Sequence, residues 1–189
     1  MCFYAVGGVA KSGPKGYLWS MNADPRTTAA VTGHRPYDGA AAASLAAAVE
    51  RAYARGYRTF LSGMAVGFDL AAAEAVLAFR AEHPGVRHVA VIPFRGQEER
   101  FSAEDRARFQ AVEAASDEVV ILSETFHRGC YAVRNRYLAD NASLVLAWYD
   151  GSPGGTRYTL RRAFARRCEV WNLHPSAALS IRTADPELF

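Results

Sequence analysis

The sequence has few cysteines, little excess of charge and no long apolar run, and each shortage excludes a class of protein. The three cysteines, Cys2, Cys130 and Cys168, lie far apart and match no metal-binding or redox spacing. An uneven number of widely separated cysteines is typical of a protein from a reducing cytoplasm rather than of a disulfide-stabilised secreted chain. We therefore expect a cytoplasmic protein that holds neither a metal nor a cofactor of its own.

A membrane-spanning run and a surplus of positive charge are also missing. No stretch approaches the ~20 apolar residues that cross a bilayer, and the N-terminal residues lack the basic start and apolar core of a signal peptide. The formal net charge is only +3, from 22 Lys and Arg against 19 Asp and Glu. Obligate nucleic-acid-binding proteins carry a larger global excess. We expect neither a membrane nor a nucleic acid as a partner.

The organisation along the chain is that of one domain with irregular ends. At 189 residues, half of them apolar, the chain is long enough to bury one core. Residues 1–26 contain glycines and prolines without a sustained period, which predicts an irregular leader. Residues 27–175 form the regular domain, and residues 176–189 form a C-terminal tail. The sequence shows no internal repeat. We also expect the protein to form a homo-oligomer.

Strands and helices are predicted to alternate through the regular domain. The predicted strands are 28–32, 57–61, 87–92, 118–122, 143–148 and 169–173, and the predicted helices are 40–54, 70–81, one ending near 116, 133–141 and 159–167. The strands are short continuous apolar runs, which indicates a parallel sheet covered on both faces. We therefore predict an α/β fold, a Rossmann-like three-layer sandwich with a mainly parallel sheet. Right-handed crossovers would gather the loops that follow the strands at the carboxyl edge.

The loop 62–69, Ser-Gly-Met-Ala-Val-Gly-Phe-Asp, joins a buried strand to an alanine-rich helix. Gly63 and Gly67 would let the backbone approach a ligand closely. The open N–H groups at the start of the next helix carry roughly half a positive charge, so the loop suits an anion, most often a phosphate. Ser62 would cap the helix or donate to a ligand. Asp69 would stabilise the helix dipole or accept a hydrogen bond from a ribose hydroxyl.

A second candidate loop follows the first strand. Gly33 permits a tight turn there, and Arg35 offers a planar guanidinium that matches a phosphate or carboxylate. Three roles are open for His34: it donates to a ligand, acts as an acid or base, or is a capping or structural residue.

A third candidate loop ends in Gly154, Gly155 and Thr156, where adjacent glycines predict a second nest of backbone donors. The loop lacks the lysine of a Walker A motif, and no complete G-x-G-x-x-G follows the first strand. The remaining candidates are Arg134 and Asn135 at the start of a helix, and the segment 94–100, which is either a lid that stacks on a base or a solvated loop.

These loops, in this order, resemble the YpsA-like branch of the SLOG superfamily, which also contains the LOG phosphoribohydrolases and the DprA/Smf proteins. The matching motifs are Thr32–Pro36, Ser62–Asp69, Ile92–Phe94 with Gln97, Tyr131 with Arg134 and Asn135, and Gly154–Thr156. They extend over roughly residues 28–173. The resemblance implies a Rossmann-like fold and a site for nucleotides or nucleotide-derived, ADP-ribose-like ligands.

We therefore predict a nucleotide sensor or binding protein whose ligand lies at the carboxyl edge. The helix starts after residues 63 and 155 would hold phosphate, and Arg35 and Arg134 would supply charge. Ser62, Asp69 and Asn135 would contact ribose or orient the ligand. The predicted ligand-binding residues are Gly33, His34, Arg35, Ser62, Gly63, Met64, Gly67, Asp69, Phe94, Gln97, Arg134, Asn135, Gly154, Gly155 and Thr156.

Two other functions stay open. LOG enzymes cleave the N-glycosidic bond of nucleoside monophosphates with an arginine before a Gly-Thr loop and a glutamate inside the next helix. Arg134 and the Gly154–Thr156 loop match part of this pattern, but residues 157–160 provide no carboxylate. The carboxylates that could substitute are Asp69, Glu74 and Asp150, so catalytic residues stay unassigned. DprA-like binding of single-stranded DNA would need a basic groove with stacking aromatics, and the low net charge disfavours it.

Overall fold

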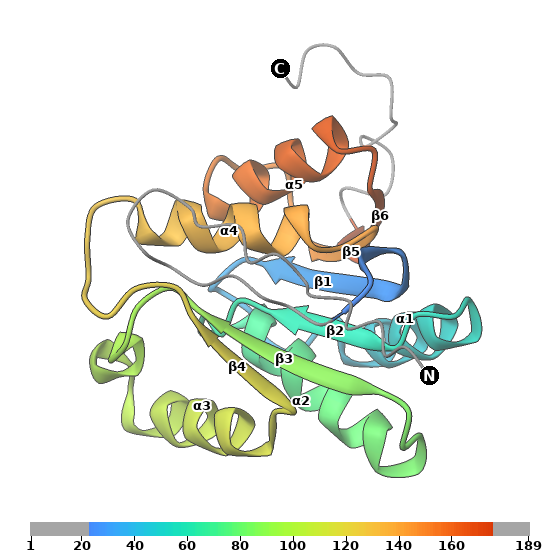
Figure 1. Cartoon of the computed structure of the whole chain (residues 1–189), viewed down its shortest axis with the longest axis horizontal. Helices are drawn as coiled ribbons and strands as arrows, with labels where there is room; N and C mark the ends of the chain where they lie inside the picture. Colours follow the sequence, from blue (N-terminus) through green and yellow to red (C-terminus); the bar gives the residue numbers. More distant parts are fainter. Residues whose placement is uncertain (1–22, 176–189) are drawn as a thin grey trace, which may run out of the picture.

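The computed structural model describes residues 23–175, which form a six-stranded sheet in the order β4-β3-β2-β1-β5-β6 (Figure 1). The strands are β1 Thr28–Gly33, β2 Thr59–Ser62, β3 Arg87–Ile92, β4 Glu118–Ile121, β5 Leu144–Trp148 and β6 Glu169–Asn172. The helices are α1 Ala42–Ala54, α2 Phe68–Glu82, α3 Ala103–Ala115, α4 Cys130–Asp140 and α5 Gly155–Ala165, with short 3-10 turns at Pro25–Thr27 (η1) and Gln97–Arg100 (η2). All neighbouring strands are parallel, which confirms the predicted Rossmann-like fold. Most of the predicted leader and all of the predicted tail lie outside the described residues.

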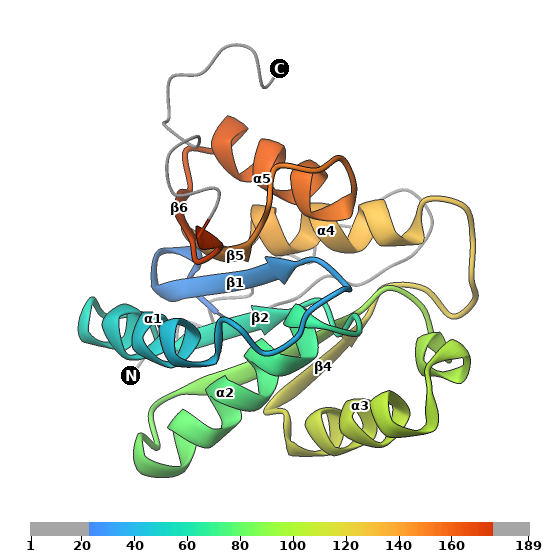
Figure 2. The same cartoon turned by 180° about the vertical axis from the view of Figure 1, so that it is seen from behind.

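The sheet is covered on both faces, as its continuous apolar strands require. Helices α1, α2 and α3 cover one face, and α4 and α5 cover the other (Figures 1 and 2). In strand β5, alternate residues of one apolar run pack against the helices on opposite faces of the sheet. Leu144 and Leu146 pack toward α1 and α2, whereas Val145 and Ala147 pack toward α4 and α5.

The order of the strands creates a switch point beside β1. The chain adds β2, β3 and β4 successively on one side of β1 and then returns to place β5 on the other side. The register pairs Gly33 at the end of β1 with Trp148 at the end of β5. Loops that leave a parallel sheet on opposite sides of such a point bind ligands in most doubly wound folds.

Three helices begin earlier than predicted. α2 starts at Phe68 rather than 70, α4 at Cys130 rather than 133, and α5 at Gly155 rather than 159. The physical reason is that their N-caps are glycines, Gly67, Gly129 and Gly154, with no side-chain cap. Sequence-based helix starts depend on Ser, Thr, Asp or Asn caps, which these helices lack. The uncapped starts therefore lie closer to the ends of the strands than the sequence indicates.

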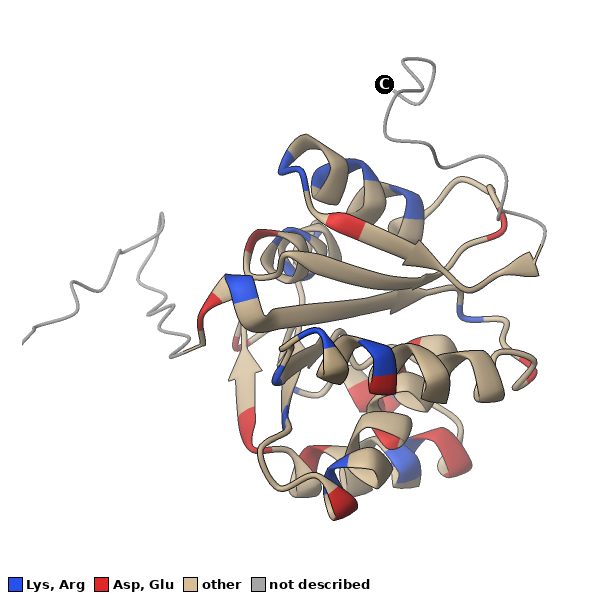
Figure 3. Ribbon diagram, turned by 90° about the vertical axis from the view of Figure 1, so that its right-hand side faces the viewer, with Lys and Arg blue, Asp and Glu red and all other residues tan. Residues whose placement is uncertain are grey.

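Charge is distributed unevenly between the two helical layers (Figure 3). The α1–α3 layer carries both signs, whereas α5 contains arginines and no acidic residue. Two of the basic residues at its C-terminal end are paired, because Arg162 lies 2.7 Å and Arg166 lies 3.4 Å from Asp140 of α4. The excess of positive charge on this layer is therefore smaller than the sequence suggests. Within the described part of the chain, no helix has the length and apolar character needed to span a bilayer.

Candidate functional site

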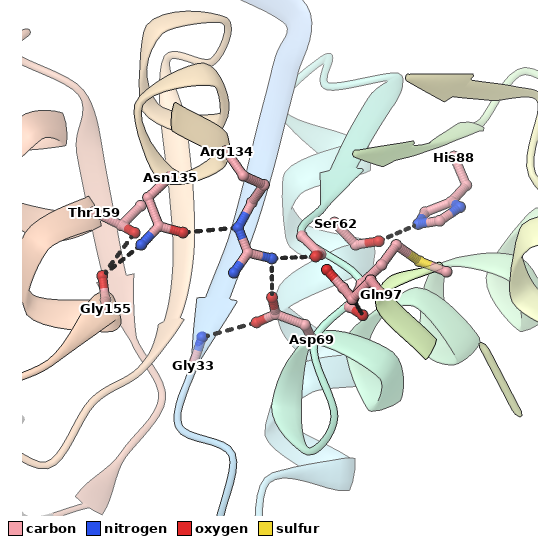
Figure 4. Close-up of polar contacts among 11 residues, drawn as sticks. Gly33, Ser62, Asp69, His88, Gln97, Arg134, Asn135, Gly155 and Thr159 are labelled. Carbon is pink, nitrogen blue, oxygen red and sulfur yellow. Dashed lines mark hydrogen bonds and ion pairs between the residues drawn. The ribbon is translucent and has the colours of Figure 1, made fainter. Parts of the chain in front are cut away.

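A buried ion pair joins the segments that meet at the carboxyl edge of the sheet (Figure 4). Arg134 Nη1 of α4 lies 3.4 Å from Asp69 Oδ2 of α2, and both side chains are less than a tenth exposed. The same nitrogen donates to the carbonyl oxygen of Gly63, and Arg134 Nε donates to Asn135 Oδ1 at 2.8 Å. Asp69 Oδ1 accepts the Gly33 N–H at 3.1 Å. The pair therefore ties the ends of β1 and β2 to the start of α2 and to α4.

Burial works against the charge on both partners. It raises the pKa of the Asp69 carboxyl, while the Arg134 guanidinium and the N–H groups of Gly33 and Ala65 pull that pKa back down. Burial likewise lowers the pKa of Arg134, and the attraction of Asp69 opposes this shift. An arginine keeps its charge in proteins. Asp69 is thus committed to internal partners, which supports its structural role over contact with a ribose.

The glycines of the predicted loops are required by this packing. A Cβ on Gly63 would lie 2.0 Å from Arg134 Nη1, and a Cβ on Gly33 would lie 2.5 Å from the Phe68 side chain. Gly67 has φ +87°, and its Cβ would lie 2.1 Å from the Arg35 carbonyl oxygen. At these positions the glycines therefore allow segments of the protein itself, rather than a ligand, to approach the backbone closely.

The start of α2 is partly occupied by the loop after β1. The Phe68 N–H donates to the His34 carbonyl oxygen at 3.3 Å, and the Arg35 carbonyl oxygen faces Gly67. One of the donors that we assigned to a phosphate is thus bonded within the protein. This helix start offers a ligand less than the sequence indicates.

Ser62 is buried, and its hydroxyl faces a histidine that no sequence motif indicates. His88, the second residue of β3, is fully buried; its Nε2 lies 2.9 Å from Ser62 Oγ, and its Nδ1 lies 2.8 Å from Ser116 Oγ. Ser116 Oγ donates to the Val112 carbonyl oxygen at 2.7 Å, so it accepts from His88 Nδ1–H, and Nε2 accepts from Ser62. Burial lowers the pKa of His88 to about 4. The imidazole is therefore neutral at pH 7 and holds the end of β2.

Two further predicted residues support the loop from within. Met64 is fully buried and has φ 56°, a left-handed conformation that non-glycine residues seldom adopt. Gln97 is also buried, and its Nε2 donates to the Met64 carbonyl oxygen at 2.5 Å. These two residues stabilise the loop conformation.

The start of α5, unlike the start of α2, is exposed. Gly154 and Gly155 are exposed, and no side chain caps the helix. Asn135 Nδ2 donates to the Gly155 carbonyl oxygen at 3.2 Å, and Thr159 Oγ1 donates to the same oxygen at 3.0 Å. The buried Thr156 side chain completes the first turn. The helix start is thus fixed to α4, is exposed at Gly154 and Gly155, and has no side-chain cap.

Polar groups without partners lie beside this helix start. The Tyr149 hydroxyl and Arg157 Nε are buried and have no hydrogen-bond partner among the described residues. Tyr149 follows β5, its side chain packs against the α4–α5 layer, and the charges of Arg157 and Asp150 both act on its pKa, which burial raises. Buried polar groups are normally satisfied, so these two donors favour an acceptor-rich ligand nearby.

A contact between a histidine and a carboxylate spans the switch point. His34 Nε2, from the end of β1, lies 2.9 Å from Asp150 Oδ1, after β5. Hydrogen bonds from Ser152, followed by the charge of His34, lower the pKa of Asp150 to about 2. The carboxylate is therefore ionised and partly exposed at the edge. Of the carboxylates that could replace the glutamate of LOG enzymes, Asp69 is bound to Arg134, and Glu74 lies 2.8 Å from Arg108. Of these three carboxylates, Asp150 is the one that lies in the loop after β5, beside the start of α5, and it is partly exposed although it contacts His34.

Phe94 and Arg35 also reach this edge. Phe94 is buried edge-on against Tyr131, with ring centroids 5.9 Å apart, and the Arg35 guanidinium lies 5.7 Å from the centre of the Tyr131 ring. Asp69 and Arg134 both feel the charge of Arg35. The structure therefore brings most predicted residues to one edge, but Ser62, Met64 and Gln97 lie beneath it.

The fold and the site define a Rossmann-like α/β protein with an uncapped glycine helix start at a switch point. The YpsA family model, described as the YspA SLOG family, matches residues 29–169, so the chain belongs to this family. The SPbeta prophage-derived protein YoqJ of Bacillus subtilis is 28% identical over 132 residues, which are 61% of this chain and 76% of that protein. A UPF0398 protein of Halalkalibacterium halodurans is 29% identical over 115 residues, 59% of this chain and 61% of that protein.

Solved structures of DNA processing protein A (DprA) share the fold. The Streptococcus pneumoniae protein aligns with a TM-score of 0.58 and 23% identity over 83% of this chain and 52% of its own. The Helicobacter pylori protein, described for its single-stranded DNA binding mode, aligns with a TM-score of 0.56 and 16% identity over 78% of this chain and 64% of its own. The chain thus spans only about half the length of the S. pneumoniae protein.

Proposed function

We propose that the protein binds the phosphate of a nucleotide or ADP-ribose-like ligand at the start of α5 and acts as a sensor or binding protein. The observation that carries the proposal is the exposed, uncapped start at Gly154 and Gly155, with the unpartnered Tyr149 hydroxyl and Arg157 Nε beside it. Backbone N–H groups and the helix dipole favour an anion there, and both unpartnered groups are able to donate to phosphate oxygens.

The charge around the start of α5 supports the same ligand. Arg35 is exposed and has no ion-pair partner among the described residues, whereas the buried charge of Arg134 is offset by Asp69. Asn135, fixed to the Gly155 carbonyl oxygen, positions the helix start. The open positions on this edge thus include backbone donors and the Arg35 cation, which complement phosphate, beside the Asp150 carboxylate, which does not.

A phosphate-binding site at α5 predicts a selective loss of affinity in Gly155→Asp. We expect AMP or ADP-ribose to bind about tenfold or more weakly by calorimetry, because a carboxylate at this position repels the phosphate. The helix itself should remain stable, since an acidic residue in the first turn complements the helix dipole. Gly155→Asn is the matched control: it has the same shape without the charge and should lose much less affinity. Equal losses in both variants would place the phosphate elsewhere.

Hydrolysis of the same ligand class is the alternative, and Asp150 is the carboxylate that favours it. Incubation with AMP, followed by chromatography for released adenine or ribose 5-phosphate, separates an enzyme from a binding protein. Release that disappears in Asp150→Asn would replace the binding-only proposal.

Single-stranded DNA is the second candidate ligand, because the chain shares its fold with DprA proteins, one of them described for that binding mode. This likeness weakens our expectation that nucleic acid is not a partner. Binding of DNA would be steeply salt-dependent, because phosphate contacts release counterions. Titration of a labelled oligonucleotide at two salt concentrations tests this candidate.

A further inference from the structure

A row of aromatic rings and guanidinium groups lies along the same edge, next to the start of α4. Phe94 packs edge-on against Phe126 on one side, with ring centroids 5.3 Å apart, and against Tyr131 on the other. Phe126 belongs to the loop between β4 and α4, which projects past the carboxyl ends of the strands in Figure 1. It is 53% exposed, the largest value for a large apolar side chain among the described residues.

An arginine lies against each end of this row. The Arg100 guanidinium is 5.5 Å from the centre of the Phe126 ring, and the Arg35 guanidinium is 5.7 Å from the centre of the Tyr131 ring. Neither arginine forms an ion pair within residues 23–175. An exposed phenylalanine in water is unfavourable, and unpaired arginines beside it add positive charge. Such a surface complements a ligand that combines a flat aromatic ring with negative charge.

Helix α4 connects the row to the proposed phosphate site. Tyr131 and Asn135 are four residues apart on α4, so they lie on the same side of the helix about one turn, ~5.4 Å, apart. Asn135 touches Gly155 at the start of α5. The Tyr131 end of the row therefore lies about one helical turn from the residue that contacts the proposed phosphate site.

We propose that the row Arg35–Tyr131–Phe94–Phe126–Arg100 is the subsite for the nucleobase of the ligand. The base stacks on the exposed Phe126 ring, and Arg100, whose guanidinium lies 5.5 Å from the centre of that ring, lies beside it. The row offers ring faces and guanidinium groups and no side-chain amide, so it accepts different bases and favours the larger purines. The subsite rests on the proposed function, in which the phosphate of the same ligand lies at α5.

The test compares Phe126→Ala with Phe126→Tyr, which keeps the ring, on two probes measured by calorimetry. AMP carries a base, and ribose 5-phosphate carries the phosphate without one. We expect Phe126→Ala to weaken AMP about five- to a hundredfold, the range for loss of one base–aromatic stack. Phe126→Tyr should bind AMP as the unchanged protein does, and ribose 5-phosphate should bind all three proteins equally. Unchanged AMP affinity in Phe126→Ala, or an equal loss for both probes, overturns the subsite while leaving phosphate binding at α5 in place.

A third probe, a ten-residue oligothymidylate, covers failure of the proposed function itself. If the unchanged protein binds neither AMP nor ribose 5-phosphate, the phosphate proposal fails. The base subsite then stands only if the oligonucleotide binds and Phe126→Ala weakens it at least fivefold, which would assign the base to a single strand. If Phe126→Ala leaves the oligonucleotide affinity unchanged, or no probe binds, the subsite is wrong as well.

Discussion

Replacing Arg134 by methionine is expected to lower the free energy of unfolding by about 3–5 kcal/mol, the usual cost of removing one partner of a buried ion pair. The substitution leaves Asp69, which is only 3% exposed, without its cation. It also removes the donors to Asn135 Oδ1 and to the Gly63 carbonyl oxygen. Denaturation by urea at pH 7 measures the loss, provided that the slope of the transition is unchanged.

Two variants separate this explanation from a general loss of packing. Asp69→Asn in the Arg134→Met background removes the unpaired charge, so the double variant should regain part of the lost stability. Arg108→Met breaks the half-exposed pair with Glu74 on the α2–α3 side, and we expect it to cost less than about 1 kcal/mol. A loss below 1 kcal/mol for Arg134→Met, or no recovery in the double variant, would show that the pair does not hold the edge together.

The fold could be predicted because its signals are local. Each strand is a short apolar run, and each connection carries helical residues, so a parallel sheet with two covered faces follows without knowledge of any contact. The convergence of the loops at one edge follows from the handedness of the crossovers. Even so, α5 was placed four residues late, because Gly154 gives none of the capping signals on which such predictions depend.

The site was predicted less completely because its contacts join distant residues. Gly63 and Arg134 were both selected, yet nothing local indicates that the guanidinium lies where a Cβ on Gly63 would be. Ser62 was assigned to a ligand, although its hydroxyl bonds to His88, which lies in the next strand and within an apolar run. Phe126 stands in a loop with no periodic pattern, and only the fold shows that it continues the row of Phe94 and Tyr131. Sequence patterns find the residues of such a site but not which of them face each other.

Lowering the pH from 7 to 4 is expected to cost the fold about 3 kcal/mol through His88 alone, since each unit of pKa shift is worth about 1.4 kcal/mol. Burial lowers the pKa of His88 from 6.5 to about 4, so the folded state favours the neutral ring. This stabilisation is complete above pH 6.5, where both states are neutral. Below that pH the unfolded chain takes up a proton that the folded protein refuses until about pH 4, and stability falls across the window between these values.

The groups that face His88 give the sign of this effect and its control. The charge of Asp117 favours protonation of the ring, and the charge of Arg80 opposes it. The hydroxyls of Ser62 and Ser116 form hydrogen bonds with the two ring nitrogens. His88→Gln removes the titration, while Asp69 titrates in both proteins and cancels in the difference. The gap in unfolding free energy between the unchanged protein and His88→Gln should therefore shrink by about 3 kcal/mol between pH 7 and pH 4. A gap that stays constant across these pH values would mean that His88 takes up its proton with the same pKa in the folded and the unfolded state, so that burial does not keep the ring neutral.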